Sequence, residues 1–256
     1  MTVTVRGAAY RSTSTVVVLA GCSVAAWIVT AWYAVDMPAA PGTMGLDVLG
    51  FLALWTVMMA AMMLPSVHPV VSLYLHRLRS ESSARLRGLR TSALVAGYLA
   101  IWSAFGLAAF GLARVGGALA DHAPSAAPWV GTGVLVAAGL YQLTPVKDLC
   151  LSHCRSPVSF LLHYGNVTGR TRDFQVGVRH GAFCVGCCWG LMVVLLVVGI
   201  MSLGWMAAIA TVVLLEKTWR HGPALSKVLG VALIGFALFV PSHPELLPGL
   251  HQTMSM

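Results

Sequence analysis

Long apolar runs recur along almost the whole sequence, and few kinds of protein can contain them. A helix needs about 20 mainly apolar residues to cross the hydrocarbon core of a bilayer. Runs of about that length are found at 15–35, 48–74, 91–114, 128–146, 181–200, 202–218 and 223–241. The sequence therefore predicts an all-α, polytopic transmembrane helical bundle of about seven spans. The count falls to six if the closely spaced fifth and sixth runs, which otherwise form a tight hairpin, are not both full spans.

The composition excludes an ordinary soluble domain. Charged residues make up 9% of the 256 residues and hydrophobic residues 58%, whereas soluble domains carry roughly a quarter charged residues. The formal charge of +8 does not indicate nucleic-acid binding, because the Lys and Arg residues sit in short segments between apolar runs. No repeat or linker divides the chain, so we expect a single integral membrane domain over residues 1–256.

The positions of the basic residues predict the topology. Cytoplasmic loops of membrane proteins are enriched in Lys and Arg. With the N-terminus inside, the inside segments contain every Lys and Arg except Arg114. The run at 15–35 is longer than the core of a cleaved signal peptide, so we expect it to be retained as a span. The chain is predicted to be a multi-pass protein of the cell inner (plasma) membrane with a cytoplasmic N-terminus.

Three cysteines begin the fifth apolar run. Cys184, Cys187 and Cys188 are spaced i, i+3 and i+4, which places their thiols on one helix face. Thiolates that share a face can share a metal ion. The alternative is that they are small apolar residues that pack beside the GxxxG pair Gly186 and Gly190.

A second pair of thiols follows the fourth apolar run. Cys150 and Cys154 are four residues apart, with His153 nearby, and would share a face if the helix continues. Their spacing is not that of a zinc ribbon, and two ordinary cytosolic thiols are the alternative. Disulfide scaffolds belong to small secreted domains, so we expect reduced cysteines, with Cys22 an isolated core residue.

The second run carries thioethers and a histidine. Met58 with Met62, and Met59 with Met63, form a continuous stripe on a helix. Such stripes are often adaptable packing rather than ligands. His68 is an ionisable residue inside a span and is therefore predicted to be functional. Pro65 removes a helical hydrogen bond close by, and we expect a local opening of the helix there.

The topology brings these groups together in the cytoplasmic half of the bundle. Glu216 lies there as well, either as half of an interfacial charge pair with Lys217 or as a second-shell group and proton acceptor; His180 could also accept protons released on metal binding. Thiolate and thioether ligands select Cu(I) over hard metals, so Cu(I) is the expected metal and Zn(II) the less favoured one. The predicted ligands are Cys184, Cys187, Cys188, Cys150, Cys154, Met58, Met59, Met62, Met63 and His68.

From about Trp55 to Lys217 the chain resembles the domain of unknown function 2182 family, whose members are described as predicted metal-binding integral membrane proteins. The resemblance rests on the methionine-rich run from Trp55 to Pro65, the segment from Lys147 to Pro157, the run from Cys184 to Met192, and the pair Glu216 and Lys217. It implies a helical membrane fold and a metal site at the matching methionines, cysteines and Glu216.

The favoured function is Cu(I) binding in metal handling, transfer or transport, with no catalytic residue predicted and an enzyme less favoured. The sequence has no Walker A motif, so transport would not use ATP hydrolysis by this chain. Expected partners are the lipid bilayer, a metal chaperone or copper enzyme, and a second copy of the chain; nucleic acid is not expected. The alternatives are a membrane thiol-disulfide oxidoreductase, a copper-dependent oxidase, and a structural scaffold subunit.

Overall fold

The computed structural model describes residues 13–36, 41–78, 83–164, 168–243 and 246–250. Every regular element in these ranges is a helix, which confirms the all-α prediction. The helices are α1 Thr13–Asp36, α2 Val48–Leu78, α3 Ala84–His122, α4 Ala127–Gln142, α5 Pro145–Arg155, α6 Pro157–Tyr164, α7 Arg172–Val197, α8 Leu203–Thr218 and α9 Gly222–Ala237. Arg6, Arg11 and Arg79, which contributed to the topology prediction, lie outside the described residues.

Four of these helices are long and apolar enough to cross a membrane: α1, α2, α3 and α7. A fifth span is formed if α4 and α5, which meet at an angle of 62°, are counted as one broken span. Helices α8 and α9 have 16 residues each, fewer than the spans predicted there. The tight hairpin expected between the fifth and sixth runs is present, and Gly199 adopts a φ of 101° in its turn.

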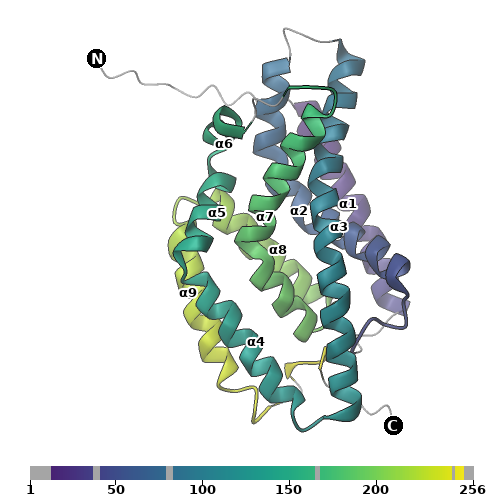
Figure 1. Ribbon diagram of the computed structural model, residues 1–256, viewed down its shortest axis with the longest axis vertical. Coiled ribbons are helices and arrows are strands. Elements are labelled where there is room, and N and C mark those ends of the chain that lie inside the picture. The colour runs from purple at the N-terminus through teal and green to yellow at the C-terminus, as the bar shows by residue number, and fades with distance from the viewer. Residues whose placement is uncertain (1–12, 37–40, 79–82, 165–167, 244–245, 251–256) are drawn as a thin grey trace.

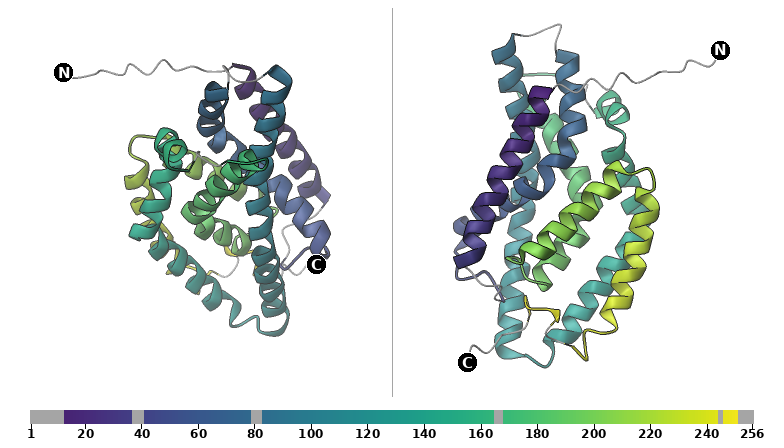
Figure 2. Two further views of the ribbon diagram at one scale, coloured as in Figure 1. Left: turned by 45° about the horizontal axis from the view of Figure 1, so that its top comes forward. Right: turned by 180° about the vertical axis from the view of Figure 1, so that it is seen from behind.

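Helices α1, α3 and α7 run in one direction along the bundle, and α2 and α4 run in the opposite direction, with α5 and α6 continuing from α4 toward the same end (Figure 1). The ends of α2 and α5, the short helix α6 and the start of α7 lie at one end. Helix α3 packs along α7, and α4 packs along α9, as the two further views also show (Figure 2). The end of α2, the start of α3 and the start of α7, which the topology prediction assigned to the cytoplasmic side, therefore lie at one end of the molecule. The α8–α9 connection, assigned to the same side, lies beside α5 (Figure 1).

Glycines let two helix pairs approach closely. A Cβ atom at Gly177 would collide with the Leu94 carbonyl group of α3, and one at Gly97 would collide with the Phe174 carbonyl group of α7. Gly139 and Gly230 play the same part between α4 and α9, where each faces the other's carbonyl oxygen. Small residues at such contacts allow dispersion forces to hold helices together where lipid supplies no hydrophobic driving force.

The polarity of the protein is inverted relative to a soluble protein. Large apolar side chains such as Ile28, Trp32 and Leu238 are more than 60% exposed. The side chain of Lys147 is completely buried, and Glu216 is 1% exposed. An apolar exterior around a charged interior suits a bilayer as the surrounding solvent.

Pro65 does not open α2, contrary to the sequence prediction. The helix continues through both Pro65 and Pro69. A proline has no N–H to donate to the carbonyl four residues before it, which here belongs to Ala61. That carbonyl accepts a 2.7 Å hydrogen bond from Ser23 Oγ of α1, so a neighbouring helix replaces the missing donor.

Candidate metal centre

Helix α7 presents three cysteines to the protein interior. Cys184, Cys187 and Cys188 are each at most 1% exposed. The Cys187 and Cys188 thiols donate hydrogen bonds to the Cys184 carbonyl oxygen, at 3.2 and 2.8 Å. The predicted common face is therefore present, and it points toward neighbouring helices rather than outward.

Helix α5 adds a fourth buried thiol. Thr144 caps its N-terminus and Pro145 occupies the first turn, which suits a new helix start after the bend that follows α4. Cys154, 6% exposed, lies with its sulfur 3.8 Å from Cys187 Sγ. The bend thus brings one end of α5 against the cysteine face of α7.

Cys150 lies one turn before Cys154 and is partly exposed. Its sulfur occupies space opposite Gly186, where an added Cβ would lie 2.8 Å from it. Gly190 faces Ala138 and Tyr141 of α4. The GxxxG pair therefore makes room for α4 and α5, so close packing and the approach of thiols occur together.

The Cys184 sulfur is the most heavily contacted of the thiols. Lys217 Nζ of α8 lies 2.9 Å from it, and Tyr98 Oη of α3 lies 3.0 Å from it. Lys217 Nζ reaches α2 as well, where it donates to Ser66 Oγ at 3.1 Å.

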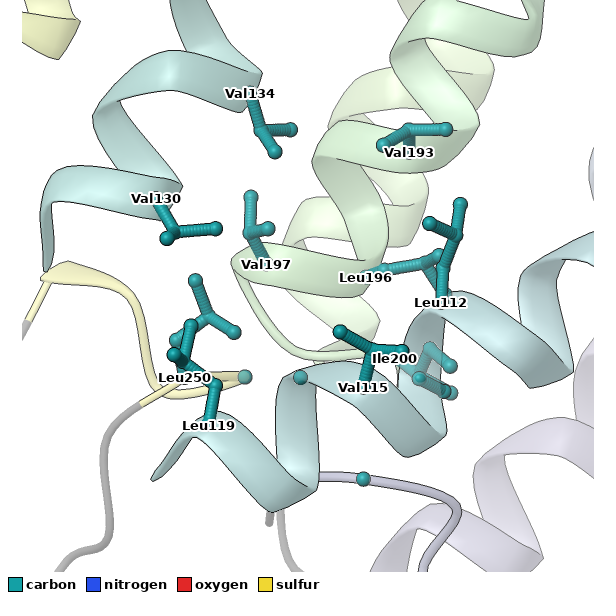
Figure 3. Close-up of a pocket in the computed structure, with 14 residues that line it drawn as sticks. Leu112, Val115, Leu119, Val130, Val134, Val193, Leu196, Val197, Ile200 and Leu250 are labelled. Atoms are coloured by element: carbon teal, nitrogen blue, oxygen red, sulfur yellow. The ribbon is translucent and has the colours of Figure 1, made fainter. Parts of the chain in front are cut away.

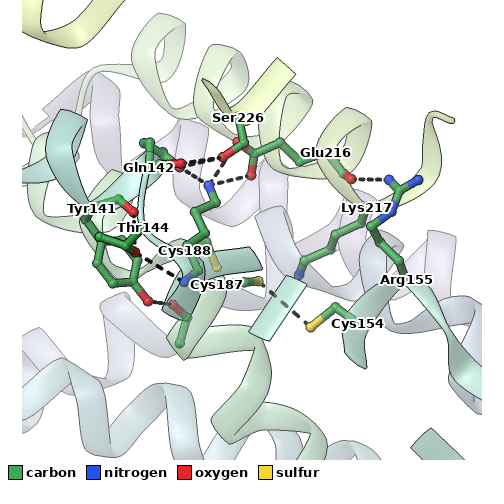
Figure 4. A network of polar contacts seen from close by, with 12 residues as sticks. Tyr141, Gln142, Thr144, Cys154, Arg155, Cys187, Cys188, Glu216, Lys217 and Ser226 are labelled. Carbon is green, nitrogen blue, oxygen red and sulfur yellow. Dashed lines mark hydrogen bonds and ion pairs between the residues drawn. The ribbon is translucent and has the colours of Figure 1, made fainter. Parts of the chain in front are cut away.

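A second buried lysine, Lys147 of α5, has a different environment. Its Nζ lies 2.9 Å from both carboxylate oxygens of Glu216 and also donates to Gln142 Oε1. Ser226 Oγ of α9 joins the network 3.1 Å from Gln142 Oε1 (Figure 4). Arg155 donates to the Glu216 carbonyl oxygen. The ammonium of Lys147 and the carboxylate of Glu216 therefore neutralise each other within this network.

This network corrects one interpretation of Glu216 and Lys217. They do not form an interfacial pair that extends to the headgroups, because both are buried, at 1% and 7% exposure. Glu216 faces Lys147 and Lys217 faces Cys184, since successive helical residues differ by about 100° in direction. The proposed second-shell role of Glu216 stays a prediction, although its carboxylate already has Lys147 as a partner.

The methionine stripe is buried in the same core. Met58, Met59, Met62 and Met63 are each at most 3% exposed and belong to one apolar cluster with the cysteines of α7. Ser66, which accepts from Lys217, follows the stripe by less than one turn. His68 is half-buried, with Nε2 2.9 Å from Ser72 Oγ on the same helix.

The donor set suits a small soft cation. No group of three or more His, Cys, Asp or Glu side chains among the described residues encloses a metal position. Two sulfurs bound to one metal at about 2.3 Å are separated by about 3.8 Å in tetrahedral and about 4.6 Å in linear geometry. Cys154 and Cys187 meet the shorter spacing. One turn before Cys184, buried His180 has an Nδ1 atom without a hydrogen-bond partner.

The roles of Tyr98 and Lys147, and the contact between Lys217 and Cys184, were not predicted from the sequence. Lys147 directly follows an apolar run, which is also where a loop cation would lie. Pro145 and Thr144 were the signal that could have corrected this, since they mark the start of a new helix. Tyr98 has no local signature, because its role depends on the packing of α3 against α7.

An apolar pocket lies toward the opposite end of α7, between α3, α4 and the segment near Leu250 (Figure 3). Its lining residues include Leu112, Val134, Val197 and Ile200, and none of its lining side chains carries nitrogen, oxygen or sulfur. The pocket therefore has no side-chain donor for a metal. The sulfur-rich region of α5 and α7 remains the candidate centre.

The fold and this region define a class: an all-helical protein with four to five potential membrane spans and with buried thiols and thioethers in its interior. The family described as PpoB2, copper chaperone, matches residues 52–240. The match covers well over half of the chain, so the protein belongs to this copper chaperone family. No curated protein and no solved structure has significant similarity to the chain.

Proposed function

We propose that the protein binds Cu(I) with the buried thiols of α5 and α7 and hands it on within or at the membrane. The observation that carries this proposal is the 3.8 Å approach of Cys154 Sγ to Cys187 Sγ, in a chain of a copper chaperone family. Thiolate and thioether donors prefer Cu(I). The interior position excludes water, which would otherwise compete for the ion.

The arrangement of the thiols supports a stepwise route. Cys150 is partly exposed, while Cys154 one turn further along α5 is buried. An ion captured by Cys150 would pass to Cys154 and Cys187 by exchange of one sulfur ligand for another. Cys184 and Cys188 extend the thiol set along α7. Ligand exchange between like donors keeps the ion bound throughout, which is what a carrier requires.

The thioethers of α2 are the proposed continuation of this route. Met58, Met59, Met62 and Met63 are neutral donors that bind Cu(I) without adding charge to the interior. Lys217 contacts both Cys184 and Ser66, so the two sulfur-bearing helices meet at one side chain. His68, further along α2, is the proposed histidine ligand on the same route, and Zn(II) is the weaker competitor.

The route is proposed to start at the cytoplasmic side of the inner membrane, with the N-terminus facing the cytoplasm and a metal chaperone or copper enzyme as partner. The gathering of the ends of α2 and α5 with the start of α7 supports a common side (Figure 1). Attaching a reporter that is active only in the cytoplasm to the α2–α3 connection tests this orientation. An inactive reporter there would reverse it.

The binding proposal is tested by anaerobic Cu(I) titration of the detergent-purified protein against a competing chelator. The double variant Cys154→Ser and Cys187→Ser is compared with Cys22→Ser. This control alters a cysteine of α1 that is exposed, contrary to the core position predicted from the sequence. We expect about one tightly bound Cu(I) per chain in the wild type and in Cys22→Ser, and its loss in the double variant. Equal copper in all three proteins would contradict the proposal.

A thiol-disulfide exchange function is the second candidate, and the same 3.8 Å contact favours it. The cysteine pair would then be Cys154 with Cys187 rather than Cys184 with Cys187 or Cys150 with Cys154. Mass spectrometry of alkylated peptides after mild oxidation separates the two functions. A rapidly formed Cys154–Cys187 disulfide with no copper retention would favour exchange, whereas copper that protects both thiols from alkylation favours the metal site.

A further inference from the structure

Lys217 is a buried cation whose surroundings contain sulfur and hydroxyl groups rather than a carboxylate. Its Nζ lies 2.9 Å from Cys184 Sγ and 3.1 Å from Ser66 Oγ. The ion pairs of the described residues join Arg90 and Arg172 to Asp173, Lys147 to Glu216, and Lys227 to Asp148. Lys217 takes part in none of these.

A buried ammonium group is costly unless an anion lies beside it. Among the described residues, the group beside Lys217 that can become negative is the Cys184 sulfur at 2.9 Å, which loses its proton when it binds a metal. The hydrogen bonds agree with this role. Tyr98 Oη and Lys217 Nζ can each donate a hydrogen bond to Cys184 Sγ, and a thiolate can accept both hydrogen bonds.

Building on the proposed function, we propose that Lys217 is the counter-charge of the thiol site and makes it select a monovalent over a divalent cation. When Cys184 is one of two thiols that lose their protons to solvent and bind one Cu(I), the complex has a charge of −1. The ammonium of Lys217 brings the sum to zero. The same two thiolates with Zn(II) are neutral, which leaves Lys217 uncompensated in the interior.

Lys147 cannot take over this role, because Glu216 neutralises it. Helix α8 separates the two functions by geometry. Glu216 is directed toward α5, and the next residue, Lys217, is directed toward α7 and α2. The site charge therefore depends on one side chain that can be replaced without breaking a carboxylate ion pair.

The experiment compares competitive binding of Cu(I) and Zn(II) by wild type, Lys217→Met, Lys217→Arg and the control Lys227→Met. Lys227 is about 42% exposed and pairs with Asp148. Its replacement also removes one positive charge, but at a position that does not contact the thiols, so it serves as the matched control. Affinities come from chelator competition, and the ultraviolet absorption of the metal–thiolate bond reports directly on the ligands. Near-ultraviolet circular dichroism checks that each variant is folded.

We expect the Cu(I)-to-Zn(II) affinity ratio to fall by about 100-fold in Lys217→Met, since a buried anionic complex loses its partner. Lys217→Arg and Lys227→Met should keep the ratio within a few-fold of wild type. An unchanged ratio in folded Lys217→Met overturns the inference while leaving Cu(I) binding intact. If Lys217→Met does not fold, a wild-type ratio in folded Lys217→Arg supports the inference, and a ratio that collapses despite the retained charge overturns it. If the wild-type protein binds neither metal, the proposed function itself is contradicted.

Discussion

The two lysines Lys147 and Lys217 are both buried, but the groups that surround them differ. Lys147 is enclosed by Glu216 and Gln142, with Ser226 behind them, so its charge is cancelled inside the fold. Lys217 faces Cys184 and Ser66. A charge cancelled by a carboxylate holds helices together. A charge cancelled only by an ionisable thiol responds to what binds that thiol, which makes the second region the one suited to function.

The largest effect is expected from removing the partner of Lys147. Glu216→Gln leaves a buried ammonium without its anion, which costs about 3–5 kcal/mol. We expect a clearly lower free energy of unfolding in detergent, measured by circular dichroism during denaturant titration. The double variant Lys147→Met and Glu216→Gln should recover much of this loss, because no charge is then left unpaired. A double variant less stable than Glu216→Gln would contradict the pairing.

A smaller stability effect is expected at Lys217. Lys217→Met replaces the ammonium by an apolar side chain of similar length, and Cys184 can remain a neutral thiol. Because no charge is then left unpaired, the change resembles the replacement of a whole buried ion pair by apolar groups, and we expect it to stay within about 1 kcal/mol. The same denaturant titration measures it. A loss as large as that of Glu216→Gln would erase the distinction between the two lysines.

The smallest effects are expected from a matched pair of buried serines, one beside each lysine. Ser226→Ala removes hydrogen bonds to Gln142 and should cost about 1 kcal/mol of stability without changing Cu(I) affinity. Ser66→Ala removes a neutral partner of Lys217 and should alter Cu(I) affinity by up to about tenfold. Stability is measured by denaturant titration and Cu(I) affinity by chelator titration. Equal Cu(I) affinities in the two variants would contradict the functional difference between the surroundings of Lys147 and Lys217.

Much of the fold could be predicted because it follows from local properties. Apolar runs predicted the cores of α1, α2, α3 and α7, and the 3.6-residue period predicted the shared face of Cys184, Cys187 and Cys188. The number of spans was less predictable. Apolar runs gave seven candidates, whereas bends and short helices leave four helices among the described residues, or five with the bent pair, that are long enough.

The candidate site could be predicted only in part. Cysteine spacing identified the candidate thiols on each helix, but not that Cys154 would meet Cys187 rather than pair with Cys150. That contact depends on the 62° bend between α4 and α5. The copper family match over residues 52–240 agrees with the metal expected from the soft ligands.

The sequence by itself determined an all-helical chain with potential membrane spans, because hydropathy and helical period are properties of neighbouring residues. Only the tertiary structure decided that Glu216 pairs with Lys147, that Lys217 lies against Cys184, and that α5 turns its thiol toward α7. These contacts join residues far apart in the chain. They arise when glycines allow helices to approach and when each buried charge finds its partner, which no local pattern records.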